Sequence, residues 1–140
     1  MSGRFFLDTN VIIYLYSEDE DSKRQAVYNL LDEHICITST QVFNESSNIW
    51  FKKYCLSKTH IKKYLNEIEA VCDEVTVIQR KTIDYALDIK ERYGFSYYDC
   101  LMLASALEGN CGIIFSEDMR DGQIIEGRLK ISNPFKNRTY

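Results

Sequence analysis

The chain has 140 residues, and its 45% hydrophobic and 27% charged residues are typical of a soluble globular protein with a substantial core. Its formal net charge of −4 disfavours a protein that works by non-specific binding to duplex DNA, because such proteins are usually basic. No apolar run approaches the roughly 18 residues of a membrane helix and no secretory signal opens the chain, so we expect a cytoplasmic protein without a membrane partner.

The predicted elements alternate between strands and helices. Residues 4–7 read as a short buried strand, followed by helices over 10–17 and 22–33. Further strands are expected at 35–38, 74–78, 112–115 and 128–132, and further helices at 40–54, 58–71, 80–93 and 97–108. Strands separated by helices predict an α/β fold, with a central parallel sheet of about five strands covered by helices on both faces.

The length and the absence of linkers favour a single domain over residues 1–140. The five cysteines are odd in number and scattered without a Cys-x-x-Cys pair. This pattern indicates buried thiols rather than a disulfide framework or a thiolate zinc site.

Carboxylates follow two of the predicted strands. Asp8 comes directly after the first strand, and the fourth strand runs into "SEDMRDG", which holds Asp118 and Asp121. Ligands of parallel sheets bind beyond the carboxyl ends of the strands, so both sets of acids lie at one edge if the two strands are neighbours. Asp8 also suits a helix cap, and the other two acids also suit turns.

Two further acids fall on apolar helix faces. Glu45 lies three residues after Val42 and four before Ile49, and Asp99 lies four residues before Leu103. A buried carboxylate without a partner is costly, so two of them facing one sheet indicate a shared cation. In the plainer interpretation, Asp99 belongs to a Ser-x-x-Asp capping signal and Glu45 is an ordinary boundary residue.

The four acids together predict a metal centre at one edge of the sheet: Asp8, Glu45, Asp99 and Asp118. Carboxylates without Cys or His suit Mg²⁺ or Mn²⁺, and such ions support phosphodiester cleavage by orienting a hydroxide and steadying the leaving oxygen. Hydrogen bonds from Thr9, Asn10 and Ser116 would hold a carboxylate, a water or a phosphate. These three residues would otherwise serve only as caps and turn formers.

Four segments together resemble the PIN domain, particularly the VapC-type toxins of bacterial toxin–antitoxin pairs: "FFLDTNVIIYLYS", "TQVFNES", "YYDCLMLASAL" and "SEDMRDGQIIEGRLKISNPF". The resemblance covers nearly the whole chain in the right order. It implies a PIN-like three-layer fold and a metal-dependent endoribonuclease that cleaves RNA. It also implies a homodimer and a small antitoxin protein that covers the active site.

The resemblance assigns roles to particular residues. It makes the four acids catalytic, with Asp8, Asp99 and Asp118 binding Mg²⁺ or Mn²⁺ and Glu45 binding it directly or through water. Supporting roles fall to four polar residues: Thr9, Asn10, Ser116 and Asp121.

Several lysines surround a predicted helix break and could grip RNA phosphates: Lys52, Lys53, Lys58, Lys62 and Lys63. The alternative is a solvated helix face. The C-terminal tail adds Lys136 and Arg138, and it either packs on the sheet edge or stays loose.

Two other functions compete with the nuclease. In a non-catalytic PIN-like binding module, the acidic pocket would serve only to bind a basic partner protein through its arginines. A phosphatase of the haloacid dehalogenase kind also has an aspartate after its first strand, but it needs a second acid two residues later. That position holds Asn10, which argues against the phosphatase.

Overall fold

The computed structural model of the protein describes residues 3–136. The predicted domain also included residues 1–2 and 137–140, among them Arg138, which lie outside the described residues. The described residues form one six-stranded sheet in the order β3-β2-β1-β4-β6-β5. The strands are β1 (Arg4–Leu7), β2 (Ile35–Ser39), β3 (Glu74–Thr76), β4 (Ile113–Phe115), β5 (Ile124–Ile125) and β6 (Leu129–Ser132).

The first four and the last of these strands run parallel, and only β5 is antiparallel, to β6. The central strand β1 places Phe6 beside Ile37 of β2 and beside Ile114 of β4. The predicted α/β fold with a mostly parallel sheet is therefore confirmed. The sequence analysis missed β5, because two residues are too few for a strand pattern to emerge.

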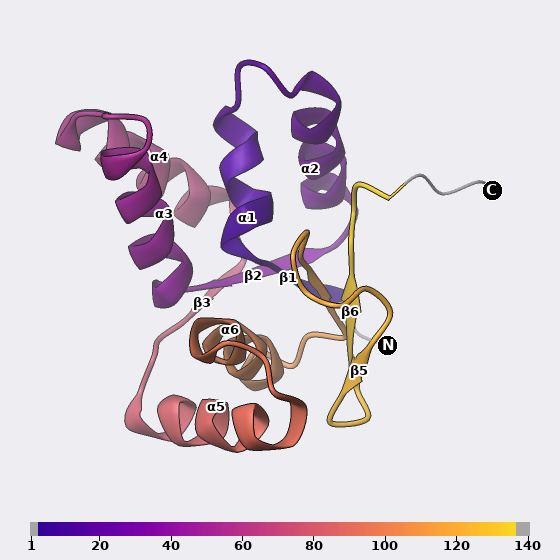
Figure 1. Cartoon of the computed structure of the whole chain (residues 1–140). Coiled ribbons are helices and arrows are strands. Elements are labelled where there is room, and N and C mark those ends of the chain that lie inside the picture. Colours follow the sequence, from indigo (N-terminus) through magenta and orange to yellow (C-terminus); the bar gives the residue numbers. More distant parts are fainter. Residues whose placement is uncertain (1–2, 137–140) are drawn as a thin grey trace.

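The helices are α1 (Thr9–Ile12), α2 (Asp21–Glu33), α3 (Thr40–Lys52), α4 (Lys58–Val71), α5 (Arg80–Tyr93) and α6 (Tyr97–Glu108). The predicted helix over 10–17 is split, because α1 tightens into the 3₁₀ helix η1 (Ile13–Tyr16). Figure 1 shows α1 to α4 on one side of the sheet and α5 with α6 on the other. Right-handed crossovers produce this arrangement, since the chain moves outward through β2 and β3 and then returns to β4.

Helix α6 forms the centre of the layer beneath the sheet. All residues from Cys100 to Leu107 are buried, so the helix is apolar on every side, as expected of a helix enclosed by protein. Its first turn, with Asp99, is the part that reaches the surface of the core. The position of Asp99 is therefore set by a rigidly packed helix rather than by a loop.

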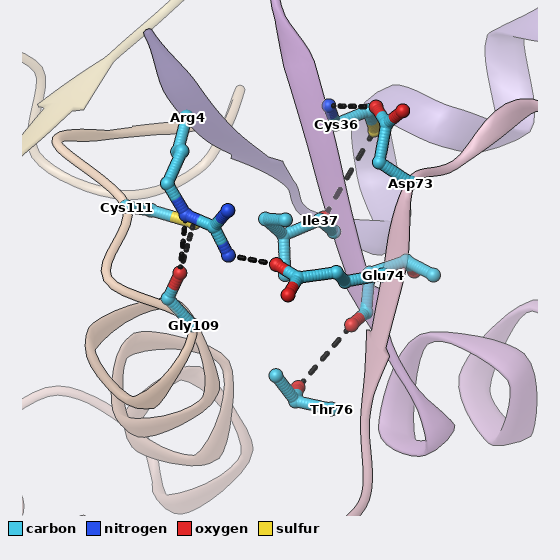
Figure 2. A network of polar contacts seen from close by, with 9 residues as sticks. Arg4, Cys36, Ile37, Asp73, Glu74, Thr76, Gly109 and Cys111 are labelled. Carbon is cyan, nitrogen blue, oxygen red and sulfur yellow. Dashed lines mark hydrogen bonds and ion pairs between the residues drawn. The ribbon is translucent and has the colours of Figure 1, made fainter. Parts of the chain in front are cut away.

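Polar contacts tie together the amino ends of the strands (Figure 2). The Arg4 guanidinium donates from Nε to the Gly109 carbonyl, 2.9 Å away, and forms an ion pair with Glu74. The backbone N–H of Cys36 donates to the Asp73 carboxylate at 2.9 Å, and the Asp73 N–H donates back to the Cys36 carbonyl at 2.8 Å. These bonds join β1 and β2 to the end of α6 and to the start of β3.

The five cysteines are free thiols, four of them buried, with Cys55 exposed. No helix within residues 3–136 is long and apolar enough to cross a membrane.

Candidate metal centre

Asp8 stands at the carboxyl edge of the sheet, between β1 and α1. Its backbone N–H donates to the Phe115 carbonyl at 3.0 Å, so the β1–β4 ladder continues up to the acid itself. The carboxylate caps α1: its Oδ1 accepts from the Thr9 N–H at 2.7 Å, and its Oδ2 accepts from the Ser116 hydroxyl at 2.9 Å. The two strands are neighbours, as the predicted site required, and the capping role of Asp8 coexists with its place in the site.

The Asp8 side chain is only 4% exposed. Burial raises its pKa from 3.8 to about 7, although the hydrogen bonds from Ser116 and Thr9 oppose the rise. The negative charges of Asp99 and Glu45 raise the pKa further. Every charged group that shifts this pKa is an acid, so the negative form of Asp8 lies in a region that favours a cation.

Asp99 approaches the same region from below the sheet, in the first turn of α6. Its backbone N–H donates to the Ser96 hydroxyl at 3.3 Å, which makes Ser96 the cap of the helix. The Asp99 side chain is half-buried, and burial raises its pKa, with a further rise from the charge of Asp118 and an opposing effect of Ser96. Asp99 thus interacts with the acids that follow both β1 and β4.

Glu45 comes from the inner face of α3, as the helical spacing predicted. Its two carboxylate oxygens accept hydrogen bonds from the Thr9 hydroxyl at 3.0 Å and from the Gln41 amide at 3.1 Å. The half-buried side chain is therefore directed toward the start of α1. Sequence analysis did not single out Gln41, although its place one helical turn before Glu45 is a signal for such a contact.

Asn10 joins the two loops at this edge. Its amide nitrogen donates to Asp118 at 3.1 Å, and its carbonyl oxygen accepts from the Glu117 N–H at 3.1 Å. The same amide lies 3.5 Å from the Ser116 hydroxyl. Asn10 therefore orients the exposed Asp118 carboxylate, and with Ser116 and Thr9 it has the supporting geometry that the sequence suggested.

Asp121 is directed elsewhere. Its Oδ1 accepts from the Asn133 N–H at 2.7 Å, and its Oδ2 forms an ion pair with Lys136 at 3.1 Å. These contacts connect the loop after β4 to the segment after β6. They match the turn-forming alternative more closely than a direct role beside Asp8.

A second layer of contacts, which sequence reasoning did not find, holds the loop after β4. Glu117 accepts from the Tyr14 hydroxyl at 2.8 Å and from the Lys23 ammonium at 2.5 Å. The Lys23 hydrogen bond raises the pKa of Lys23 and lowers that of Glu117, although burial opposes both shifts. Residues 23 and 117 are far apart in sequence, so no local pattern could have paired them.

The lysines predicted to grip RNA are all exposed, at the end of α3 and along α4. Lys52 lies seven residues beyond Glu45, which corresponds to roughly 10 Å along the helix axis. Lys53 stacks over the Tyr54 ring, 5.6 Å from its centre. Their exposure is compatible both with an RNA contact and with a solvated helix face.

The donor set fits a hard divalent cation. Carboxylate, hydroxyl and amide oxygens gather at one edge, and the buried Asp8 carboxylate lies among other acids. Among residues 3–136, no three His, Cys, Asp or Glu side chains are already arranged as a finished metal site. Glu45 and Asp118 instead accept hydrogen bonds from their neighbours.

The comparisons with known proteins concern the fold and the family. A toxin–antitoxin complex from Klebsiella pneumoniae is similar at 18% identity and a TM-score of 0.69, over 94% of this chain and 98% of that chain. VapBC2 from Rickettsia felis, bound to a promoter DNA fragment, is similar at 18% identity and a TM-score of 0.67, over 93% of this chain and 98% of that chain. The sarcin–ricin loop-cleaving toxin VapC20 from Mycobacterium tuberculosis is similar at 16% identity and a TM-score of 0.66, over 81% of this chain and 89% of that chain. At these identities the likeness shows the fold alone.

Among curated proteins, no sequence matches significantly. The family model of the PIN domain matches residues 5–122, which include all four acids of the candidate metal centre. The chain therefore belongs to the PIN domain family.

Proposed function

We propose that the protein is a metal-dependent endoribonuclease, the toxin component of a toxin–antitoxin pair. The observation that carries this proposal is the buried Asp8 carboxylate, whose pKa is raised to about 7 in a region where each charged neighbour that shifts it is also an acid. A bound cation would stabilise the charged form of such a group, in addition to the capping role that Asp8 has at the start of α1. Membership of the PIN domain family and the likeness to toxin structures support the same conclusion.

Mg²⁺ or Mn²⁺ would be held by Asp8, Asp99 and Asp118, with Glu45 binding directly or through water. When bound, the ion polarises the RNA phosphate and makes a water easier to deprotonate. Around this centre, Ser116 and the Thr9 N–H fix both oxygens of Asp8.

The orienting groups complete the arrangement. Thr9 and Gln41 direct Glu45 toward the start of α1, and Asn10 directs Asp118. These hydrogen bonds to packed elements orient the carboxylates toward one edge, and metal binding would exchange some of them for bonds to the ion.

We also propose the partners that this function requires: an RNA substrate, a second copy of the chain in a homodimer, and a small antitoxin protein. Several structural neighbours are toxin–antitoxin complexes, which supports the last of these. An arginine of the antitoxin would suit the acidic centre, because a guanidinium can bind two carboxylate oxygens at once. We place the activity in the cytoplasm.

One observation favours the alternative of a non-catalytic module that binds a basic partner. Three of the four acids, Asp8, Glu45 and Asp118, already accept hydrogen bonds from protein groups. In that alternative the acids would recognise a cationic side chain, and purified protein would leave RNA intact.

The test is digestion of a structured RNA and a messenger RNA by purified protein, with Mg²⁺, Mn²⁺ or chelator. We expect cleavage only with a metal, and Asp8→Asn should reduce it by more than about 100-fold, because it removes a direct ligand's charge. The matched control is Asp88→Asn, the same change at an exposed position of α5, which should cleave normally. Cleavage that survives both chelation and Asp8→Asn would refute the mechanism.

A further inference from the structure

A groove lies between α2 and the face of the sheet formed by β4 and β6. Its volume is about 640 Å³, within the range of roughly 300–1,000 Å³ that holds drug-sized ligands and hence a nucleotide or two. Ala26 and Leu30 line it from α2, and Ile113 and Phe115 line it from β4. The floor of this α2 groove is therefore apolar and partly aromatic.

The rim of the α2 groove is cationic. Lys23, Lys130 and Lys136 line it, and none of the described residues that line it is acidic. Lys23 and Lys136 form ion pairs with acids outside the lining, whereas the described residues hold no ion pair to Lys130. Lys130 therefore contributes most of the positive charge of the groove, in a chain whose net charge is −4. Such a groove is complementary to a polyanion.

Two of these lysines connect the α2 groove to the loop after β4, which also carries Asp118. Lys23 forms an ion pair with Glu117, one residue before Asp118, and Lys136 forms an ion pair with Asp121. Ser132 lines the groove, and its carbonyl accepts from the Ser116 N–H at 3.0 Å. One end of the groove therefore opens beside the loop that carries the proposed metal ligand.

Aromatic rings stand at this same end. The Phe135 ring packs edge-to-face on Tyr14, with ring centres 5.1 Å apart, and the Lys23 ammonium lies 5.1 Å from the centre of the Phe135 ring. A ring that lines the groove beside a cation offers a base a stacking surface and offers a phosphate a positive charge. Sites for single-stranded nucleic acid combine these two features.

We propose that the α2 groove binds the single-stranded RNA that flanks the cleaved bond, with bases against its apolar floor and phosphates along Lys23, Lys130 and Lys136. This inference rests on the proposed ribonuclease function and extends it, because it gives the RNA a path away from the metal centre. That path lies along α2 and β6 rather than along the lysines of α3 and α4. An acidic peptide is the competing occupant, and the position beside Asp118 favours RNA.

The experiment measures RNA binding without cleavage. Protein carrying Asp8→Asn, in the presence of chelator, is titrated into a labelled ten-nucleotide single-stranded RNA of mixed sequence. Lys130→Glu should weaken binding at least tenfold and lower the salt dependence by about one phosphate contact. The matched control is Lys81→Glu, the same charge change at an exposed position of α5 on the other side of the sheet, which should change binding less than twofold.

A second measurement does not depend on a variant. The same RNA with 5-iodouridine, cross-linked by light, should label the peptides that contain Phe115 or Phe135.

In the binding assay, a protein with Lys130→Arg should bind the RNA as tightly as one with Lys130, because arginine keeps the positive charge at that position.

Three results would overturn the inference. Equal weakening by Lys130→Glu and Lys81→Glu would show a net-charge effect alone. Cross-links confined to the segment from Lys52 to Lys63 would place the RNA on α3 and α4 instead. Displacement of the RNA by a short glutamate-rich peptide, with no cross-link in the groove, would assign it to a protein partner.

The assay contains no metal, so it separates this inference from the proposed function. If wild-type protein binds RNA through the α2 groove but cleaves none, only the proposed nuclease activity is refuted. If the protein cleaves RNA with metal but its RNA affinity is unchanged by Lys130→Glu, only the proposed RNA binding in the groove is refuted.

Discussion

The two edges of the same sheet handle charge in opposite ways. At the amino edge, the Arg4 cation meets the Glu74 carboxylate and the Gly109 carbonyl, and the Asp73 carboxylate accepts from a backbone N–H (Figure 2). At the carboxyl edge, the charges that act on Asp8 come from other acids. At the amino edge, charged groups therefore meet partners, whereas at the carboxyl edge burial and neighbouring acids disfavour the charged form of Asp8.

This difference separates structure from function within one element. Strand β1 begins at Arg4, in contacts that stabilise the fold, and leads to Asp8, whose charged form is destabilised by burial and by nearby acids. Variants at the two ends of this strand should have effects of opposite sign on the free energy of unfolding.

The largest effect should come from Asp8 and depend on pH. Its pKa is about 7 in the folded protein and near 3.8 when unfolded, so between these values the folded state holds more protons. Metal-free stability should therefore fall as pH rises from about 4 to about 7, by on the order of 4 kcal/mol from this group. Chemical denaturation at several pH values, with Asp8→Asn for comparison, measures this term.

Asp8→Asn should remove that pH dependence and be more stable than the wild type at pH 8 without metal. Glu74→Gln, at the amino edge, should show neither effect. If Asp8→Asn is markedly less stable at pH 8, the residue serves the fold as a cap and the contrast between the edges is lost.

At the amino edge, Arg4→Met should destabilise the protein by about 2 kcal/mol. The change leaves the Gly109 carbonyl without its charged donor and removes the ion pair with Glu74. Thermal denaturation should show the loss equally with and without Mn²⁺. A loss that appears only with the metal would connect the amino edge to the site and contradict the separation.

Divalent metal should stabilise the carboxyl edge selectively. At ten times its dissociation constant, Mn²⁺ should add about 1.4 kcal/mol to the free energy of unfolding, because it binds only the folded state. Asp8→Asn and Asp99→Asn should reduce this gain, and Arg4→Met should keep it. An equal gain in all four proteins would indicate non-specific binding.

The smallest effect should come from Lys23→Met, at about 1 kcal/mol or less. The ion pair with Glu117 is partly exposed, with 28% and 25% of the two side chains accessible, and such pairs contribute little. The expected consequence is greater freedom of the loop with Asp118, seen as weaker Mn²⁺ binding in calorimetry. Unchanged Mn²⁺ affinity would show that the loop is held well enough without Lys23, by contacts such as those of Asn10 and Tyr14.

Much of this architecture could be predicted from sequence, because the signals are local. The ends of α4, α5 and α6 lie where the caps and apolar spacing placed them, and Glu45 lies on the inner face of α3. The same logic fails for β5, which is too short to show a pattern. It also misjudged the extent of the first helix, since η1 tightens after Ile12.

The contacts that organise the site were harder to foresee, because they join distant parts of the chain. The pairing of Lys23 with Glu117 and of Thr9 with Glu45 depends on the order of the strands, which no periodicity specifies. Asp118 and Asp121 both follow the fourth strand in sequence, with a supporting role predicted for Asp121, and the structure directs Asp121 to the segment after β6. Two acids three residues apart in one loop face different partners, and only tertiary structure separates them.

The hydroxyl of Ser116 donates to Asp8 and accepts from the Met119 N–H at 3.3 Å. This single oxygen atom therefore connects the loop after β1 to the acidic loop after β4. Mutation to alanine deletes that atom without altering the backbone or the apolar packing. A single substitution would therefore weaken the site around Asp8 and preserve the fold. Under the proposed function, such a variant would keep the surface that binds a partner protein and lose a support of the metal centre.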